Sequence, residues 1–404
     1  MSCADRDRLN PLDPKNEATR GRPTGFRVIS IQDTVFLRWD TIELDDLLGY
    51  RLYRKSNLEP EFILLAEIPP DENTYADFDV DFGVEYAYQL SAAVPGHESA
   101  RTDALPITPG PSFTWFADEA GDRVVKLTHD TRYTIHTTSG FFGLVDIAAD
   151  PCAGVAWVVN RNSIISGDVL RIDASGRVVL PRVNFTTPVE IALDLNSGAA
   201  WVADRGAGEV VKLNSSANRL FSVQGLGEPV SVSVDQTTGD CLVADRRGDR
   251  VTAISADGSA TRDFAGPLNA LRALRVNSTE SSVWVSDSTR VMKFTLAGVA
   301  VLTLPQEFNF ANTLAVNEGT GDIWVSDLSR GTVSKFSTSG AKEFEVTGFN
   351  NPVDLAVNLF DGSCIVADRL NNRLVRIAAD GSIERTLDGA GFPFAVAVQN
   401  SCPE

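Results

Sequence analysis

The side chains best suited to chemistry recur at one position of a repeat that occupies the last three-quarters of the chain. The position lies two residues after the residue, often Pro, that opens the first apolar segment of each repeat. It is occupied in turn by Asp146, Glu190, Ser231, Ala273, Thr313, Asp354 and Ala395. Converging carboxylates and hydroxyls are ligands that Ca²⁺ prefers, so a bound cation is one prediction. The alternative is that the acids are solvated, or neutralised by Arg272 and Arg275.

Arg275 breaks a second pattern, because the residue two before the end of each first segment is otherwise small. The small residues are Ala148, Ala192, Ser233, Ala315, Ala356 and Ala397. Small side chains suit the narrow radius near an axis on which the segments converge. We therefore expect one ligand-binding site built from Asp146, Glu190, Ser231, Arg275, Thr313 and Asp354.

Acid–base catalysis at neutral pH usually requires histidine, and this chain has only three. His97 lies in an N-terminal module, while His129 and His136 lie outside the segments that carry the acids. Nucleophile-elbow, zinc-protease and P-loop motifs are absent from the sequence. The sequence thus predicts no catalytic residues and no cofactor, and favours a binding protein.

The repeat that must position these side chains is marked by a tetrapeptide of the form Trp-Val-(Ala/Ser)-Asp. Its copies end at Asp118, Asn160, Asp204, Asp245, Asp287, Asp327 and Asp368. A spacing of about 40 to 44 residues with strand-like content marks a ring of β-blades. We expect the tryptophans to be buried between blades, and the recurrent aspartates to accept hydrogen bonds from turn amides.

The repeat resembles the NHL-repeat β-propeller family, whose units share the order Pro-strand, Gly turn, Val-Ala-Asp strand, turn, strand. The resemblance implies an all-β fold over residues 112–404 with ligands bound at the channel mouth where the first strands begin. Because the array starts with a second strand and ends with a first strand, residues 393–399 should pair with residues 113–118. That pairing predicts seven blades and a ring closed by the C-terminal strand, without a free edge.

Residues 24–109 alternate apolar and polar side chains at the period of a β-strand. The module resembles a fibronectin type III β-sandwich, with Trp39 at the core position and Tyr86 at the position of the tyrosine corner. The resemblance implies a spacer or docking module. Asp77, Asp79 and Asp81 alternate along a strand and its turn, which favours a solvated acidic face.

Residues 1–23 are polar and are expected to form a flexible tether. This start resembles a mature bacterial lipoprotein, which would place lipid on Cys3 and make Met1 and Ser2 foreign to the mature chain. The alternative is a native Met1 and an ordinary thiol at Cys3. Cys152 and Cys402 follow the inner strands of neighbouring units, so a disulfide between them is one possibility.

A net charge of −18 disfavours nucleic acid as a partner, and no apolar run is long enough to span a bilayer. We expect an extracytoplasmic, non-enzymatic binding or scaffold protein at the bacterial cell surface or in the periplasm, touching the membrane only through a lipid anchor. Its partner would be a protein, a peptide or a glycan. The alternatives are a structural subunit of a surface assembly or filament, and a lyase or hydrolase resembling the streptogramin lyases of the propeller class.

Overall fold

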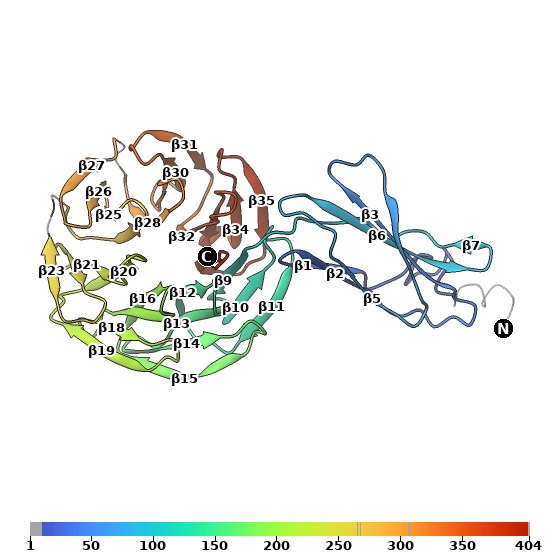
Figure 1. The fold of residues 1–404 in the computed structure, drawn as a ribbon, viewed down its shortest axis with the longest axis horizontal. Helices are drawn as coiled ribbons and strands as arrows, with labels where there is room; N and C mark the ends of the chain where they lie inside the picture. Colours follow the sequence, from blue (N-terminus) through green and yellow to red (C-terminus); the bar gives the residue numbers. More distant parts are fainter. Residues whose placement is uncertain (1–9, 265, 267, 306–307, 403–404) are drawn as a thin grey trace. The chain divides into compact units, whose positions relative to one another are not determined.

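The computed structural model describes residues 10–264, 266, 268–305 and 308–402. Within these ranges the secondary structure is β-strand apart from one short 3-10 segment, η1 (Arg369–Asn371) (Figure 1). None of the described segments is a helix of the length and apolarity that crossing a membrane requires. The chain divides into two compact units, which are described separately. One comprises the residues up to Pro111 together with Leu127–Ile135, and the other comprises Ser112–Lys126 and the residues from His136 onward.

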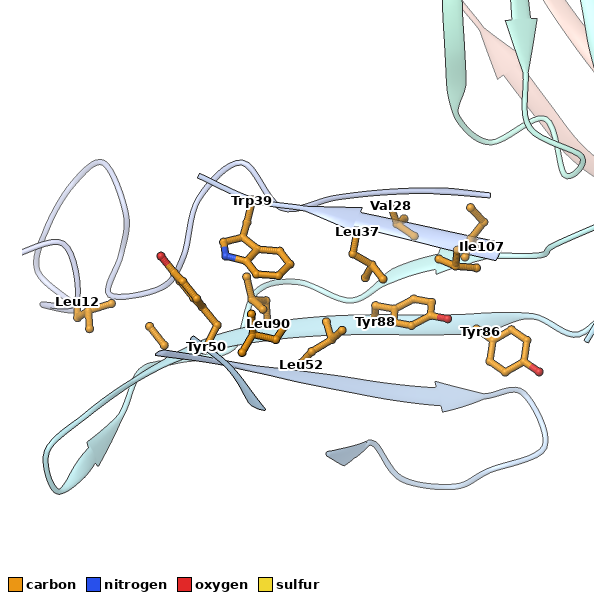
Figure 2. Packing of buried hydrophobic residues seen from close by; sticks show 13 residues of the cluster. Leu12, Val28, Leu37, Trp39, Tyr50, Leu52, Tyr86, Tyr88, Leu90 and Ile107 are labelled. Carbon is orange, nitrogen blue, oxygen red and sulfur yellow. The ribbon is translucent and has the colours of Figure 1, made fainter. Parts of the chain in front are cut away.

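The first unit contains two antiparallel sheets. The three-stranded sheet has the order β1 (Arg27–Ile31), β2 (Thr34–Arg38), β5 (Thr74–Asp77). The other has the order β4 (Ile63–Ile68), β3 (Gly49–Ser56), β6 (Tyr86–Val94), β7 (His97–Glu98), and β8 (Leu105–Ile107) also pairs with β6. Side chains from both sheets form one hydrophobic cluster (Figure 2). In it the rings of Trp39 and Tyr50 lie 5.4 Å apart, and Tyr88 and Leu90 are fully buried.

Two predictions for the N-terminal region need correction. Residues 10–23 form hydrogen-bonded turns, and Leu12 packs into the hydrophobic cluster, so the predicted flexible tether does not extend over them. Cys3 lies outside the described residues. The prediction of a solvated acidic face is wrong for Asp77. This residue is buried and accepts hydrogen bonds from Arg54 Nη1 (2.8 Å) and from the Tyr88 hydroxyl (2.8 Å). The side chain of Asp79 is 94% exposed, as a solvated acid should be.

The second unit consists of repeated four-stranded antiparallel sheets, seven within the described residues, arranged as a ring (Figure 1). The repetition is that of a multi-bladed β-propeller. The sheets, from the inner to the outer strand, are β36 (Pro393–Gln399), β9 (Phe113–Asp118), β10 (Arg123–Leu127), β11 (Thr134–Ser139); β12 (Leu144–Asp150), β13 (Val155–Ser163), β14 (Ser166–Ile172), β15 (Val178–Phe185); β16 (Pro188–Asp194), β17 (Ala199–Asp204), β18 (Glu209–Leu213), β19 (Arg219–Gln224); β20 (Pro229–Val234), β21 (Cys241–Asp245), β22 (Arg250–Ile254), β23 (Thr261–Phe264); β24 (Ala273–Asn277), β25 (Ser282–Ser286), β26 (Val291–Thr295), β27 (Ala300–Thr303); β28 (Ala311–Val316), β29 (Ile323–Asp327), β30 (Thr332–Phe336), β31 (Lys342–Thr347); and β32 (Pro352–Val357), β33 (Cys364–Asp368), β34 (Arg373–Ile377), β35 (Ile383–Asp388).

The C-terminal strand closes the first of these sheets, which confirms the predicted pairing. In β36, Val396 lies opposite Phe116 of β9, and Gln399 lies opposite Phe113. The indole Nε1 of Trp115 donates a hydrogen bond to Gln399 Oε1 at 2.9 Å. Residues nearly three hundred positions apart therefore share one sheet, and β9 is not left as an edge strand.

The recurrent Trp and Asp residues hold the ring in the way their types predict. Five second strands bury a tryptophan completely, and each packs in a cluster with strands of a neighbouring sheet or of its own. Asp204 accepts hydrogen bonds from the amides of Thr186 and Thr187 (2.7 Å each), in the loop before β16. Asp245 accepts the corresponding amides of Gly227 (3.0 Å) and Glu228 (2.8 Å). The prediction of turn-amide acceptors is confirmed.

Candidate functional site

The inner strands of all seven described sheets surround one cavity of about 270 Å³. Four of the six predicted site residues line it: Asp146 on β12, Glu190 on β16, Arg275 on β24 and Asp354 on β32. The repeat therefore brings together side chains that are up to 208 positions apart in the sequence, from 146 to 354. The rest of the lining comes from other residues of the inner strands and from Gln236 and Glu318, which lie just beyond two of them.

The cavity extends along the inner strands from the acids toward the ends of the strands. Its lining runs from the level of Asp146 to Gln236 and Glu318, which follow the last residues of their inner strands. Among the described residues, none that precedes the level of Asp146 on an inner strand contributes to the lining. The acids and Arg275 form the end of the cavity that is nearer the start of the inner strands.

The other members of the predicted column lie behind the cavity wall. Ser231 is 1% exposed, and its Oγ accepts a hydrogen bond from the Leu274 amide at 3.1 Å. Thr313 is 5% exposed and donates from Oγ1 to Asp354 Oδ1 at 3.4 Å. Ala273 and Ala395 are buried in hydrophobic clusters between sheets. These four residues support the site but are not open to a ligand.

Each acid of the column binds the main chain of the next inner strand, a role that the sequence did not reveal. Asp146 Oδ2 accepts the Ile191 amide (2.8 Å) and Glu190 Oε2 accepts the Val232 amide (2.9 Å). Asp354 Oδ2 accepts the Val396 amide (2.8 Å). We call these three contacts the inter-blade latches. They stabilise the ring, since an amide buried without an acceptor costs free energy.

A β-bulge places each of these acids. The pairing of every latch-bearing strand with its neighbour shifts register at the acid, between Leu144 and Asp146 in β12 and between Pro352 and Asp354 in β32. The same shift occurs in β16, immediately before Glu190. A bulge turns a side chain away from the ordinary alternation of a strand. The signal that could have identified the latches is an acid two residues after the first residue of the inner strand, which is Leu144, Pro188 or Pro352.

Arg275 supplies the positive charge of the cavity. Its Nη1 lies 2.7 Å from Glu190 Oε1 and donates to the Leu274 carbonyl at 2.8 Å. Burial opposes its charge, but Glu190, Asp354 and Asp146 together raise its pKa. The predicted neutralisation of the acids by arginine therefore applies to Glu190, whose charge is balanced by Arg275. Arg272 has no such role, since its guanidinium lies over the Phe310 ring, 3.9 Å from the centroid.

The remaining acids hold their protons more tightly than usual. Burial, followed by the charges of Glu190 and Asp354, raises the pKa of Asp146 well above its ordinary range. Burial likewise raises the pKa of Asp354 to about 6, against the lowering effects of the Val396 amide and Arg275. Burial and then Asp235 raise the pKa of Glu318. The cavity thus contains more carboxyl groups than it has cations to balance them, and it favours a positively charged occupant.

The described residues contain no group of three or more His, Cys, Asp or Glu side chains placed to hold a metal ion. The three histidines also lie away from the cavity lining. His97 is in β7 of the first unit, and His129 lies in the segment that belongs to that unit. His136 is in β11, the outermost strand of its sheet, and packs edge-on against Trp115 at 5.0 Å.

Cys152 and Cys402 form a disulfide with Cα atoms 4.8 Å apart. Cys152 follows β12 and Cys402 follows β36, so the bond ties the segment after the last strand to the neighbouring sheet. Cys241 and Cys364 are fully buried free thiols, and burial raises the pKa of both. The seam of the ring therefore combines strand pairing with a covalent link.

The β13–β14 hairpin carries an exposed apolar surface that the sequence analysis did not single out. Ile164 and Ile165 at its tip are 86% and 73% exposed, and Phe142 beside its base is 62% exposed. Asn160 joins these parts, since its Oδ1 accepts the Phe142 amide at 2.8 Å. Among the corresponding turns of the other sheets, all of them described, only that of β33–β34 exposes a large aliphatic side chain, Leu370 at 47%.

Neither a protein-family model nor a curated protein matches the sequence. Solved structures do match the fold. Virginiamycin B lyase from Staphylococcus aureus, in an inactive variant with quinupristin, has a TM-score of 0.50 at 12% identity, over 69% of this chain and 89% of that one. The dihydro-heme d1 dehydrogenase NirN has a TM-score of 0.53 at 12% identity, over 68% and 63%. Nidogen, from a complex with laminin, has a TM-score of 0.48 at 12% identity, over 71% and 98%. At this identity the likeness shows a β-propeller fold and nothing of activity.

Proposed function

We propose that this protein is a non-enzymatic, extracytoplasmic binding protein that holds a protein or peptide partner on the rigid face of its propeller. In this proposal the second unit is a seven-bladed ring of the NHL type, and the first unit is a fibronectin type III-like spacer. The observation that carries the proposal is the exposed tip of the β13–β14 hairpin, with Ile164 and Ile165 in water.

The hairpin departs from its six counterparts in both length and polarity. β13 has nine residues, whereas β17 and β21, which occupy the same place, have six and five. Burying two isoleucines and one phenylalanine on a partner would contribute roughly 1.5 to 3 kcal/mol each before binding costs. Aliphatic and aromatic anchors of this kind favour a protein or peptide over a glycan, whose hydroxyl groups need polar partners.

The use of the cavity acids as inter-blade latches supports a binding role over catalysis. Asp146, Glu190 and Asp354 each have an oxygen committed to a main-chain amide. A group so committed is poorly placed to move a proton to a substrate. The disulfide supports an oxidising location, which fits a cell-surface or periplasmic protein anchored through lipid on Cys3.

Site-specific crosslinking tests the proposal. A photo-crosslinking residue at position 165 of the full-length protein should capture one protein in the source cells. The same residue at position 299, where Val299 is 63% exposed in the turn between β26 and β27, should not capture it. Purified partner should then bind the wild type and lose at least about tenfold in affinity to an I164D/I165D variant, and V299D should retain binding. Equal capture at both positions, or equal affinity of both variants, would contradict the proposal.

The same hairpin also fits the second candidate, a subunit of a surface assembly, if its partner is another copy of this chain. Light scattering of the purified protein over a range of concentrations distinguishes the two. A mass that rises with concentration in the wild type and stays monomeric in I164D/I165D would favour the assembly. A constant monomer mass in both proteins favours a different protein as partner.

A further inference from the structure

A row of arginines lies on one face of the ring, at the end of the sheets where the inner strands begin. Four of the seven described sheets have an Arg directly after the residue that ends the repeat tetrapeptide: Arg161, Arg205, Arg246 and Arg369. The main-chain amide of each donates to the carbonyl of the residue just before the inner strand, as from Arg205 to Thr187 (3.0 Å) and from Arg246 to Glu228 (2.9 Å). The four arginines therefore lie at one level of the ring.

Side chains at this position reach from one sheet to the next. Nη2 of Arg369 lies 2.5 Å from Oε2 of Glu119, which holds the same position in the neighbouring sheet. Arg161, Arg205 and Arg246 hold it in three consecutive sheets. Along this part of the ring, three positive charges are neighbours with no acid of the same row between them.

Arg272 continues the row into a fourth sheet. Arg246 donates from Nε to the carbonyl of Leu271 at 3.1 Å, which places its guanidinium beside Arg272. Arg272 donates from Nε to Ser288 Oγ at 3.2 Å. Burial and then the charge of Arg246 lower the pKa of Arg272, and only Glu228, which pairs with Arg246 at 3.2 Å, raises it. The two fixed cations thus share one acid.

The other charges in this region leave the row positive. Arg161, Arg205 and Arg247 form no ion pair within the described part of the chain, and Arg205 and Arg247 are exposed. Asp249 accepts a main-chain amide at 2.6 Å, and Asp204 is buried on the turn amides before β16. We call the row from Arg161 to Arg272 the arginine arc. In a chain with a net charge of −18 it reverses the local sign of the surface and favours an anionic ligand.

The arginine arc begins at the exposed β13–β14 hairpin. Arg161 comes three residues before Ile164, and its amide donates to the carbonyl of Gly143 at 2.9 Å, next to Phe142. Ile164, Ile165 and Phe142 are the exposed apolar side chains of this region. The apolar and the positive surfaces are therefore continuous, and a chain segment that covers the hairpin has the arginines directly beside it.

We propose that the partner presents an acidic segment, in which Asp or Glu side chains adjoin apolar ones, and that this segment lies along the arginine arc from the hairpin to Arg272. The inference rests on the proposed function and adds the chemistry of the partner. Guanidinium groups bind carboxylates through paired, charge-assisted hydrogen bonds. Arginines held in place beforehand, as Arg246 and Arg272 are, lose little side-chain freedom on binding.

Peptide selection tests this chemistry without knowledge of the partner. Random peptides displayed on phage are selected on the immobilised full-length protein at low salt, and in parallel on an R205E/R246E variant. Peptides enriched on the wild type should combine an excess of Asp and Glu with Leu, Ile or Phe, and they should not be enriched on the variant. Enriched peptides without an excess of acids, or equal enrichment on both proteins, would overturn the proposal.

The affinity of one selected peptide, measured by fluorescence anisotropy, tests the site. R205E/R246E should bind at least about tenfold more weakly than the wild type, and raising the salt from about 50 to about 200 mM should weaken the wild type. R205E alone changes an exposed side chain, which keeps the fold intact, and should lose at least about threefold. R177E is the matched control, since Arg177 is exposed in the turn between β14 and β15, at the opposite end of its sheet, and should bind as the wild type does. Unchanged affinity in both arginine variants refutes the acidic segment.

An I164S/I165S variant, which adds no charge, separates this inference from the proposed function. Loss of peptide binding in I164S/I165S together with the arginine variants supports both. A loss confined to I164S/I165S leaves the proposed function standing and overturns the inference. A loss confined to the arginine variants supports the acidic ligand and removes the hairpin from its site. Equal binding of a sulfated oligosaccharide, which has no apolar side chain, would assign the arc to polyanions and overturn the proposal.

Discussion

Replacing Asp354 by Asn should make the protein more stable at alkaline pH and change little in acid. The carboxyl group is buried, and burial raises its pKa from 3.8 to about 6. An acid with a raised pKa binds more protons in the folded state than in the unfolded state. Its favourable contribution is therefore complete below about pH 4 and is lost as the pH rises through about 6. The raised pKa corresponds to about 3 kcal/mol that ionisation of Asp354 removes from the folded state.

Asparagine imitates the protonated carboxyl group and keeps the latch. Its side-chain oxygen can accept the Val396 amide, which now binds Asp354 at 2.8 Å, and its amino group can donate to Thr313 Oγ1. We expect D354N to exceed the wild type in free energy of unfolding by up to about 3 kcal/mol near pH 8, with the difference vanishing near pH 4. Guanidinium unfolding of the oxidised protein across this range measures both curves.

Glu190→Gln is the matched contrast, because Glu190 belongs to an ion pair with Arg275 at 2.7 Å. Removing its charge leaves a buried guanidinium without its partner, so E190Q should destabilise the protein at neutral pH. The reasoning fails if the difference between wild type and D354N stays constant from about pH 4 to pH 8, since Asp354 would then titrate alike in both states.

Three further predictions concern the ring itself. Asp146→Ala should cost about 1 to 3 kcal/mol of unfolding free energy by leaving the Ile191 amide without an acceptor, whereas Asp146→Asn should retain most of the stability in chemical denaturation. Trp284→Ala, at a fully buried position, should cost about 3 to 5 kcal/mol in the same assay, and a loss below about 1 kcal/mol would contradict the packing. Cys152→Ser with Cys402→Ser opens a link across 250 residues and should cost up to about 5 kcal/mol, seen as a lower melting temperature that reductant does not change further.

Much of the fold could be predicted because the signals are local and repeated. The Trp-Val-Ala-Asp strand buries its Trp and uses its Asp on nearby turn amides, as Trp201 and Asp204 show. Those preferences depend on residue type and on neighbours within one repeat. The leftover strands at the two ends of the array also predicted the pairing of β36 with β9. The equivalence of Asp146, Glu190 and Asp354 followed from the same period, so the sequence brought the candidate site together as a set.

The role of those side chains was decided only by the tertiary structure. A β-bulge turns Asp146 and Asp354 toward main-chain amides of the next sheet. The sequence of a single repeat does not show which acceptor those amides will have. The direction of the cavity follows from this, because the latched acids and Arg275 occupy one end of it. The sequence by itself determined which residues are equivalent, since the repeat can be recognised from the residue types alone. The partners of each residue depend on contacts between sheets, which exist only once the ring has formed.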